Sequence, residues 1–335
     1  MNLHQLFHQK RILITGGTGS FGNALVQTLN RDVKGFPIGA IITIFSRDEK
    51  KQQDMSLKFP KNNINYIVGD VRDKDKLLSS FKNIDYVFHA AALKHVPVGE
   101  KFPDEVLKTN TIGTKNVIEA AEECGVKKVV NFSTDKAAFP INAYGMSKAL
   151  AEKLVCAHRG DTICVNLRYG NVIGSRGSVI PIFIDKIKKG MSLLVTNSYM
   201  TRFLLLLEHA VKLSLLCISN GEAGDLFVIK SPACTVGTIV KALELHYGQK
   251  FVIHKMGVRP GEKIHETLLT PDERFKAIDK AIKQEGDITY TVVPSTRSNH
   301  LHSFEEHNLE PFTSENTIRY GVENTLYLIR KAGIL

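Results

Sequence analysis

The stretch RILITGGTGSFG, residues 11–22, sets the expectation for the fold. It is a short apolar run that ends in a glycine-rich turn, and an amphipathic helix is expected to follow through about Leu29. Gly16, Gly19 and Gly22 form a TGxxGxxG pattern between the strand and the helix. Glycine lets the backbone turn tightly and approach a pyrophosphate, which the positive end of the following helix attracts. The stretch therefore predicts a dinucleotide-binding turn.

The chain beyond this turn alternates between short apolar runs and helical patterns. Strands that alternate with helices imply a parallel, doubly wound sheet with right-handed crossovers. We therefore expect an α/β fold of the Rossmann type. The expected strands are residues 11–15, 40–45, 64–68, 86–89, 129–132 and 164–169, and the expected later helices are residues 48–58, 73–81 and 104–124.

This alternation ends after the sixth expected strand. Loops rich in Gly, Ser and Arg follow, as in GNVIGSRGSVIP from Gly170, and later segments alternate irregularly. We expect a dinucleotide-binding domain over residues 1–170, to which a segment around residues 200–230 returns. Residues 171–335 are expected to form mainly a smaller, partly discontinuous α/β region that binds the substrate.

Composition favours a soluble globular enzyme. The 335 residues carry a formal net charge of +10, which suits an anionic ligand, but no Lys/Arg run is dense enough for a nucleic-acid-binding arm. The five cysteines lack paired metal-ligand spacing, so we expect reduced thiols and no metal. The N-terminus has no apolar signal core, and the most apolar run, from Phe203, is broken by Glu208, His209 and Lys212. These features predict a cytoplasmic protein without a membrane span.

The residues after the second expected strand bear on the choice of dinucleotide. NAD-specific sheets usually place a carboxylate there, which binds the ribose 2′-hydroxyl. This chain has Ser46 and Arg47, with Lys50 nearby. A hydroxyl and a guanidinium suit a 2′-phosphate, so we expect NADP. Asp70 and Val71 follow the third strand, at the usual adenine-contact position, although Asp70 equally suits a plain turn.

The stretch NFSTDKAAFPINAYGMSK, residues 131–148, carries the candidate catalytic residues. Tyr144 and Lys148 share one helix face at this spacing, and a cation there lowers the pKa of the phenol. A tyrosine with a lowered pKa can act as a base near neutral pH. Tyr-x-x-x-Lys alone is more often a solvent-facing pair, and Thr134-Asp135 is also typical of a helix cap or turn. The glycine turn earlier in the chain favours a catalytic role for both motifs.

A set of strings along the chain resembles one group of sugar-nucleotide enzymes. The strings run in order from about residue 11 to 317, and they are GGTGSFG, SRDEKK, GDVRD, HAAALKHVP, KTNTIGT, STDKAAFPINAYGMSK, RYGNVIGSRGSVIP, MTRF, RPGEKIHE and TSENT. In these strings the chain is similar to the UDP-N-acetylglucosamine 4,6-dehydratases, especially the C5-inverting type, within the extended short-chain dehydrogenase/reductases. The resemblance implies a sugar that is oxidised at C4, loses water across C5 and C6, and is reduced at C6.

The resemblance also implies a role for each catalytic residue. Tyr144 would remove the proton of the C4 hydroxyl, and Lys148 would help it and bind the nicotinamide ribose. Thr134 would donate a hydrogen bond to the C4 oxygen. Asp135 would be the acid at C6, and Lys136 the base at C5, where related dehydratases carry Glu. A lysine base must be neutral, so we expect neighbouring cations to lower the pKa of Lys136.

Two sets of binding residues follow from the same resemblance, together with a homo-oligomer, dimeric or hexameric, that makes sugars for bacterial surface polysaccharides. The NADP set is Gly16, Thr18, Gly19, Ser20, Phe21, Gly22, Ser46, Arg47, Lys50, Asp70, Val71, Ala90, Ala91, Ala92, Lys94, Asn110, Tyr144 and Lys148. The set for UDP-N-acetylglucosamine is Lys94, Asn171, Val172, Ser178, Val179, Thr201, Arg202, Arg259 and Glu262.

Three other functions remain open from the sequence. A C5-retaining dehydratase would pass through the same enone and differ only in the face that is reprotonated. A nucleotide-sugar 4-epimerase would share the fold, but it needs no C5 base, so the Thr-Asp-Lys triplet argues against it. A non-catalytic NADP-sensing scaffold would usually lack the Tyr or the Lys of the motif, and this chain has both.

Overall fold

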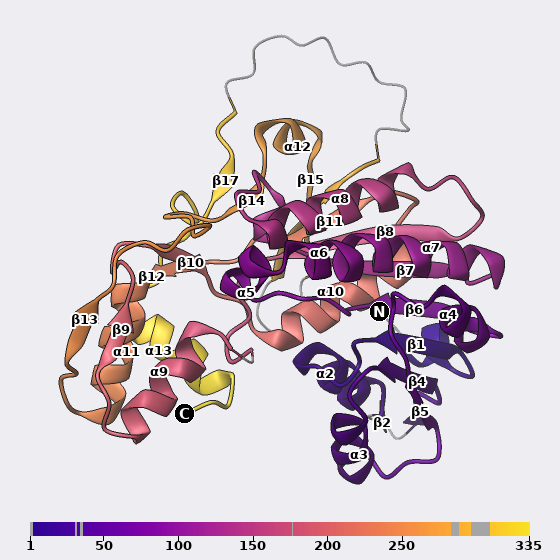
Figure 1. The fold of residues 1–335 in the computed structure, drawn as a ribbon, viewed down its shortest axis with the longest axis horizontal. Coiled ribbons are helices and arrows are strands. Elements are labelled where there is room, and N and C mark those ends of the chain that lie inside the picture. Colours follow the sequence, from indigo (N-terminus) through magenta and orange to yellow (C-terminus); the bar gives the residue numbers. More distant parts are fainter. Residues whose placement is uncertain (1–2, 31, 34–35, 176, 283–287, 296–308) are drawn as a thin grey trace.

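A nine-stranded sheet forms the centre of the computed structural model (Figure 1). The structure describes residues 3–30, 32–33, 36–175, 177–282, 288–295 and 309–335. In spatial order the strands are β15 (Ile278–Ile282), β16 (Ile288–Val293), β11 (Leu226–Ile229), β8 (Ile163–Tyr169), β7 (Lys128–Thr134), β6 (Tyr86–His89), β1 (Arg11–Thr15), β4 (Ile41–Ser46) and β5 (Ile64–Val68).

Seven of these strands, from β11 to β5 in spatial order, run parallel, and β16 and β15 are added antiparallel at one edge. Helices cover both faces of the sheet. The expected doubly wound, Rossmann-type sheet is therefore confirmed. The six expected strands match β1, β4, β5, β6, β7 and β8 to within two residues at each end, whereas β11, β15 and β16 carried no clear sequence signal.

Each face of the sheet has its own apolar core, because side chains alternate along a strand. Ile12 and Ile14 of β1 pack in one cluster with Leu25, and Leu13 packs in another with Leu77 on the opposite face. The first core lies under α1 (Leu3–Phe7), α2 (Ser20–Leu29) and α10 (Leu207–Asn220), and the second under α4 (Lys74–Phe81), α7 (Gly113–Glu123) and α8 (Ala143–Ala157). The helix α3 (Glu49–Lys58) follows β4.

The helix expected over residues 104–124 is divided into three pieces. They are α6 (Pro103–Val106), a wider π-helical segment η1 (Leu107–Ile112) and α7, and α5 (Val96–Lys101) precedes them. In η1 the buried Asn110 bonds both backbone groups of Leu93 and the hydroxyl of Ser147. A π-helical turn inserts an extra residue into a helix and changes where a side chain points. Here it aims Asn110 at the loop after β6.

Segments from the second half of the chain build a second region beside the sheet, at the left in Figure 1, and they are α9 (Val179–Lys188), β9 (Leu193–Val195), α11 (Val236–Tyr247), β13 (Ile253–Lys255) and α13 (Val322–Lys331). Its core joins Ile184, Leu193, Leu243 and Ile329. Among the described residues no helix has both the length and the apolar character needed to cross a membrane. The remaining elements are β2 (Asp32–Val33), β3 (Phe36–Pro37), η2 (Asp135–Ala137), β10 (Thr201–Phe203), β12 (Ala233–Thr235), β14 (Thr267–Leu269), α12 (Pro271–Lys276) and β17 (Phe312–Thr313).

Two glycines allow close backbone contacts around the turn that joins β1 to α2. A Cβ atom at Gly22 would lie 1.9 Å from the carbonyl oxygen of Gly17. Gly16 has a φ of +63°, and a Cβ there would lie 2.8 Å from the backbone of Ala91. The turn between β1 and α2 therefore excludes any side chain at these two positions.

We predict that Gly22→Ser lowers the free energy of unfolding by about 1–3 kcal/mol, the usual cost of overpacking a closed contact. Gly321→Ser is the matched control, because φ at Gly321 is −78° and an added Cβ would meet nothing within 4 Å. Denaturant unfolding of both variants measures the difference. Equal stability of the two would show that α2 can move away from the turn without cost.

Candidate active site

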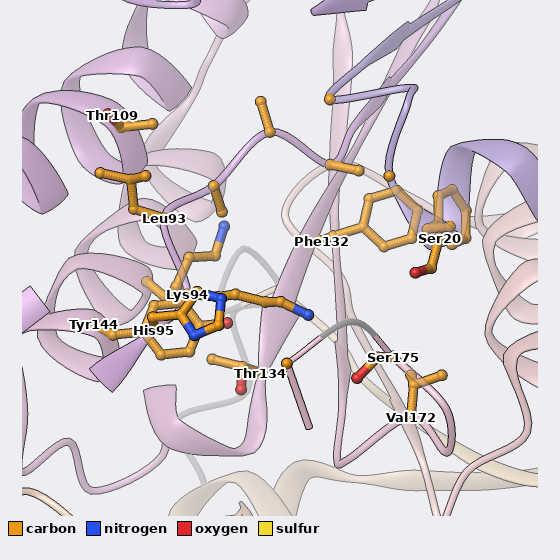
Figure 2. Close-up of a pocket in the computed structure, with 18 of the residues that line it drawn as sticks. Ser20, Leu93, Lys94, His95, Thr109, Phe132, Thr134, Tyr144, Val172 and Ser175 are labelled. Carbon is orange, nitrogen blue, oxygen red and sulfur yellow. The ribbon is translucent and has the colours of Figure 1, made fainter. Parts of the chain in front are cut away.

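A cavity of ≈ 580 Å³ opens at the carboxyl ends of the parallel strands. Its wall comes from the turn after β1, the ends of β4 and β5, the loop after β6, the end of β7, the start of α8 and the loop after β8. Figure 2 shows Lys94 and His95 near Thr134 and Tyr144, with Ser20, Phe132 and Ser175 on other parts of the wall. In open α/β sheets ligands bind at this end of the strands.

The turn at one end of the cavity fits a pyrophosphate. Gly16 and Gly19 hold the backbone open in front of α2, whose first residues have backbone N–H groups without partners inside the helix. Of the NADP set, fifteen residues line the cavity, namely Gly16, Thr18, Gly19, Ser20, Phe21, Ser46, Arg47, Asp70, Val71, Ala90, Ala91, Ala92, Lys94, Tyr144 and Lys148. The residues present therefore suit a dinucleotide.

Three members of that set do not line the cavity. Gly22 packs against the backbone of Gly17, and Asn110 supports the loop after β6 from below. The ammonium of Lys50 pairs with Asp54 on the exposed side of α3, at 2.7 Å. Its neighbour Lys51 lines the cavity instead.

Arg47 lies at the rim of the cavity, where its side chain is about half exposed. Its Nη1 is 3.7 Å from Asp70 Oδ2, which is closer to Arg72, at 2.6 Å. Partial burial would raise the pKa of Asp70, but the hydrogen bonds from Arg72 lower it below its usual value. The hydroxyl of Ser46 accepts a hydrogen bond from Gln52 Nε2 at 3.0 Å. The hydroxyl of Ser46 and the guanidinium of Arg47 therefore both lie at the end of β4.

Tyr144 lies in the first turn of α8, which Asn142 caps by accepting a hydrogen bond from the backbone N–H of Gly145. Burial raises the pKa of Tyr144, while the charge of Lys136 and a hydrogen bond with Thr134 oppose the increase. The expectation that a cation at Lys148 lowers this pKa is therefore wrong in two respects. The net shift is upward, and the cation that acts on the phenol is Lys136.

Lys148 is almost fully buried, with its Nζ 3.4 Å from Asn131 Oδ1. Burial lowers the pKa of Lys148 to about 8, although the nearby carboxylate of Glu152 acts in the opposite direction. Asn131 in turn donates to Asn166, which donates to the backbone of Glu152. This chain of amides fixes the ammonium against the cavity wall.

The ammonium of Lys136 lies between two carboxylates. Its Nζ is 3.0 Å from Asp135 Oδ1 and 3.0 Å from Glu266 Oε1, and both carboxylate side chains are 2% exposed. Thr134 donates a hydrogen bond to Asp135 Oδ1 at 3.0 Å, and its hydroxyl also accepts from the backbone of Lys136, as in a helix cap. The helix-cap interpretation of Thr134-Asp135 is therefore confirmed, and the catalytic role of the two residues stays a prediction.

The expected lowering of the Lys136 pKa is wrong. Burial alone would lower it, but the charges of Asp135 and Glu266 outweigh burial and raise the pKa above its usual value. Burial raises the pKa of Asp135, against the opposing effect of Lys136. For Glu266 the nearby charges of Lys136 and Arg202 prevail over burial, and the pKa is lowered. At rest the lysine is thus charged and Glu266 ionised.

Glu266 was not singled out from the sequence, although it ends the string RPGEKIHE from which Glu262 was chosen. It lies one residue before β14 and reaches Lys136 across a long separation in sequence. The contact becomes visible only in the structure, where the end of β7 and the segment before β14 lie next to each other. Glu266 itself does not line the cavity, and the lining residues that the sequence did not assign include Leu93, His95, Thr109, Phe132, Tyr169, Ser175 and Leu207.

The expected substrate residues divide into two groups. Asn171, Val172, Ser178 and Lys94 line the cavity, whereas Val179, Thr201, Arg202, Arg259 and Glu262 do not. Asn171 Oδ1 and Ser178 Oγ are buried without a hydrogen-bond partner among the described residues, and Arg176 lies outside the described residues.

The non-lining residues belong to the layer behind the cavity. Thr201 bonds His265 and Ser314, and Arg202 donates to the backbone of Thr201. Arg259 Nη1 is 3.7 Å from Glu262 Oε1, in a loop that Asn142 Nδ2 joins through the carbonyl of Gly261. This layer holds Glu266 and the end of β7 together.

The sheet and its glycine turn define a doubly wound fold of the Rossmann type. The chain belongs to the polysaccharide biosynthesis protein family, whose model matches residues 12–284. It is 44% identical over 338 residues to a Rickettsia akari protein named UDP-glucose 4-epimerase, with 97% of this chain and 96% of that protein covered.

Two solved structures extend the comparison. Pen from Bacillus thuringiensis is 33% identical, with a TM-score of 0.86, and 98% of this chain and 99% of that chain are covered. DesIV from Streptomyces venezuelae, a dTDP-glucose 4,6-dehydratase solved with NAD bound, is 20% identical, with a TM-score of 0.65 over 76% of this chain and 86% of that chain. The second likeness is one of fold.

The lowered pKa of Lys148 predicts a specific pH dependence of stability. Between about pH 8 and the ordinary lysine pKa of 10.5, the unfolded chain binds more protons at this residue than the folded chain does. The free energy of unfolding should therefore rise with pH in this interval, relative to a Lys148→Met variant, because the buried charge is relieved. Denaturant unfolding on both sides of pH 8 tests this, and Lys153→Met, exposed on the same helix, controls for loss of a lysine. A stability difference that stays constant for Lys148→Met would contradict the prediction.

Proposed function

We propose that the protein is an NADP-dependent UDP-N-acetylglucosamine 4,6-dehydratase that inverts C5. The observation that carries this proposal is the buried group of Asp135, Lys136 and Glu266 beside Thr134 and Tyr144. Oxidation at C4 needs one base, which Tyr144 can provide. Removal of the C5 proton and of the C6 hydroxyl needs a further base and a further acid. The cavity wall holds titratable groups for both tasks.

When bound, the nicotinamide cofactor supplies the redox chemistry at C4 and C6. The chain's own residues bind it and move the protons. The start of α2 would hold the pyrophosphate, and Lys148, fixed by Asn131, would bind the nicotinamide ribose. Thr134 and Tyr144 bond each other, so both hydroxyls can reach one oxygen, which we assign to C4 of the sugar.

Proton transfer at C4 and C5 is linked through the charge of Lys136. The charged lysine opposes the increase that burial gives the pKa of Tyr144, and the ionised phenol, once formed, would take the proton of the C4 hydroxyl. Once Tyr144 is neutral, the ammonium loses that attraction and gives up a proton more readily. Lys136 can then act as the base at C5. Burial raises the pKa of Asp135, which supports its proposed role as the acid for the departing C6 hydroxyl.

The sugar is expected to contact polar atoms that have no other partner in the described part of the chain. Asn171 Oδ1 and Ser178 Oγ are two such buried atoms on the side of the cavity formed after β8. A hexose offers hydroxyl and amide N–H groups as donors. A buried acceptor that lacks a partner costs about 1–3 kcal/mol, so its satisfaction favours binding.

The second candidate is a nucleotide-sugar 4-epimerase. The relative from Rickettsia akari, which is named UDP-glucose 4-epimerase and aligned over nearly the whole of both chains, favours it. An epimerase would use Tyr144, Thr134 and Lys148 in the same way and return the sugar to the oxidation state of the substrate. It would leave Asp135, Lys136 and Glu266 without a proton-transfer step.

Product analysis by NMR separates these functions. We expect the full chain with NADP to convert UDP-N-acetylglucosamine in deuterium oxide to UDP-2-acetamido-2,6-dideoxy-β-L-arabino-hexos-4-ulose, with solvent deuterium at C5. The D-xylo isomer from the first turnover would indicate a retaining dehydratase instead. Formation of UDP-N-acetylgalactosamine, or of UDP-galactose from UDP-glucose, would establish the epimerase. Cofactor binding without turnover of either sugar would leave only the sensing role.

The choice of NADP rests on Arg47 and Ser46 at the end of β4. We predict that Arg47→Ala weakens NADP binding by about 1.5–3 kcal/mol, roughly 10- to 100-fold in Kd, and leaves NAD binding nearly unchanged, because only NADP has a 2′-phosphate. Lys58→Ala, at the far end of α3 over the ring of Phe59, is the control for charge. Calorimetric titration measures both cofactors. Equal affinity of the unmodified protein for NAD and NADP would overturn the assignment.

A further inference from the structure

Glu266 lies opposite Asp135 across the ammonium of Lys136. Each carboxylate has one oxygen 3.0 Å from Lys136 Nζ. The second oxygens, Asp135 Oδ2 and Glu266 Oε2, are buried and have no hydrogen-bond partner among the described residues. The Lys136 side chain is one-fifth exposed. The nearest proton acceptors for this ammonium are therefore two protein carboxylates and not bulk water.

The backbone holds Glu266 firmly in this position. Its N–H donates to the hydroxyl of Ser314, and the N–H of Ser314 donates back to the carbonyl of Glu266, both at 2.8 Å. The Ser314 hydroxyl also bonds Thr201. Glu266 is thus fixed on the segment before β14, while Asp135 and Lys136 lie at the end of β7 of the large sheet and directly after it. A surface carboxylate that pairs with a lysine would not usually have its backbone fixed by two such hydrogen bonds.

The dehydration proposed above has an unmet requirement at Lys136. A lysine takes a proton from C5 only when it is neutral, and the neighbouring carboxylate of Glu266 favours its charged form. Asp135 cannot receive the lysine proton while it carries the proton intended for the C6 hydroxyl. Within the described part of the chain, the acceptor that remains in contact with Lys136 Nζ is Glu266.

We propose that Glu266 is a third member of the acid–base unit, which accepts a proton from Lys136 before C5 is deprotonated and returns it to Asp135 through Lys136 afterwards. This inference rests on the proposed dehydratase function. Glu266 lies behind the cavity wall and acts on the substrate through Lys136. It is therefore a positioning residue that also stores a proton.

The protons balance over the elimination. At the start Asp135 is a neutral acid, Lys136 an ammonium and Glu266 a carboxylate. One N–H proton passes to Glu266 Oε1, the neutral amine takes the C5 proton, and Asp135 gives its proton to the C6 hydroxyl, which leaves as water. The three residues hold as many protons after these steps as before. Lys136 then gives a proton to Asp135, and Glu266 gives its stored proton to Lys136. These two transfers restore the starting state.

The charges around Glu266 make the stored proton temporary. Lys136 faces it from η2, Arg202 Nε lies 3.8 Å away on β10, and Lys263, Asp135 and Tyr144 complete the titratable groups that act on the cluster. The cations favour the ionised carboxylate. A proton on Glu266 is therefore released once Asp135 is ionised.

The test compares Glu266→Gln, Glu266→Asp and the unmodified protein. Glutamine keeps the size and a hydrogen-bond acceptor for Lys136 but cannot take up a proton, whereas aspartate keeps the acid on a shorter side chain. Glu315→Gln is the control, because Glu315 is an exposed carboxylate on the same face, 3.5 Å from His265. Each full-length protein is loaded with NADP and mixed with UDP-N-acetylglucosamine that carries deuterium at C5. Absorbance of the reduced nicotinamide reports C4 oxidation, NMR reports release of deuterium to water, and calorimetry reports sugar binding.

We expect Glu266→Gln to bind the sugar and oxidise C4 as the unmodified protein does, and to release C5 deuterium roughly 10²-fold more slowly or worse, the usual size of an acid–base contribution. The slow release should accelerate about tenfold per pH unit, because solvent must now remove the lysine proton. Glu266→Asp should restore part of the rate, and Glu315→Gln should match the unmodified protein.

The alternatives give different results. A purely structural Glu266 would slow C4 oxidation and C5 exchange together and leave the pH profile unchanged, which would overturn the inference. Unchanged C5 exchange in Glu266→Gln would also overturn it, with the dehydratase function intact. If the unmodified protein itself oxidises C4 but releases no C5 deuterium, the proposed function fails, and the role of Glu266 fails with it.

Discussion

The site depends on one buried ammonium held by two buried carboxylates. Removal of charges from water is costly, and a group of this kind is stable only when each charge has a close opposite partner. Loss of one partner from a buried pair typically costs about 3–5 kcal/mol, because the other charge is left uncompensated. Lys136 therefore does more than offer an amine to the cavity. It joins the end of β7 to the segment before β14, since its ammonium lies 3.0 Å from Asp135 Oδ1 and 3.0 Å from Glu266 Oε1.

A second buried group anchors the helix that carries Tyr144 and Lys148. Arg168 of β8 bonds both oxygens of Glu152 on α8 and both oxygens of Glu273 on α12, and its side chain is 2% exposed. Glu152 lies one turn after Lys148 and keeps the pKa of that lysine from falling further. The large sheet, the helix α8 and the later segments are thus tied together by ion pairs at two points. The ion pairs of Lys136 and Arg168 therefore determine the shape of the cavity between the sheet, α8 and the later segments.

The sequence predicted the parts of the molecule that local patterns control. Residues 11–22 gave the strand, the turn and the helix, because the glycine spacing reflects a close approach that only glycine permits. The ends of the strands placed Thr134 and Arg47 at the same edge of the sheet. The wrong expectations concern effects that depend on distant residues. No local pattern places Glu266 beside Lys136. The pKa of Lys136 was therefore expected to be lowered, whereas it is raised. For the same reason Lys148 was expected to act on the phenol of Tyr144, whereas the cation that acts on it is Lys136. Lys50 was chosen where Lys51 lines the cavity, since one residue of helical phase decides which side chain faces inward.

The fold is shared by epimerases and dehydratases alike, so the distinction between them must come from the groups around the sugar. Both reactions begin with oxidation at C4, and the arrangement of Tyr144, Thr134 and Lys148 serves either one. The group of Asp135, Lys136 and Glu266 is different, because a buried ion cluster with no chemical task is usually no more stable than apolar residues of the same volume. Two of its oxygens lack partners in the described part of the chain, which adds a cost that packing alone does not explain. The proposed proton transfer at C5 and C6 would give these charges a use, and the physical argument for dehydration therefore rests on the cost of keeping them buried.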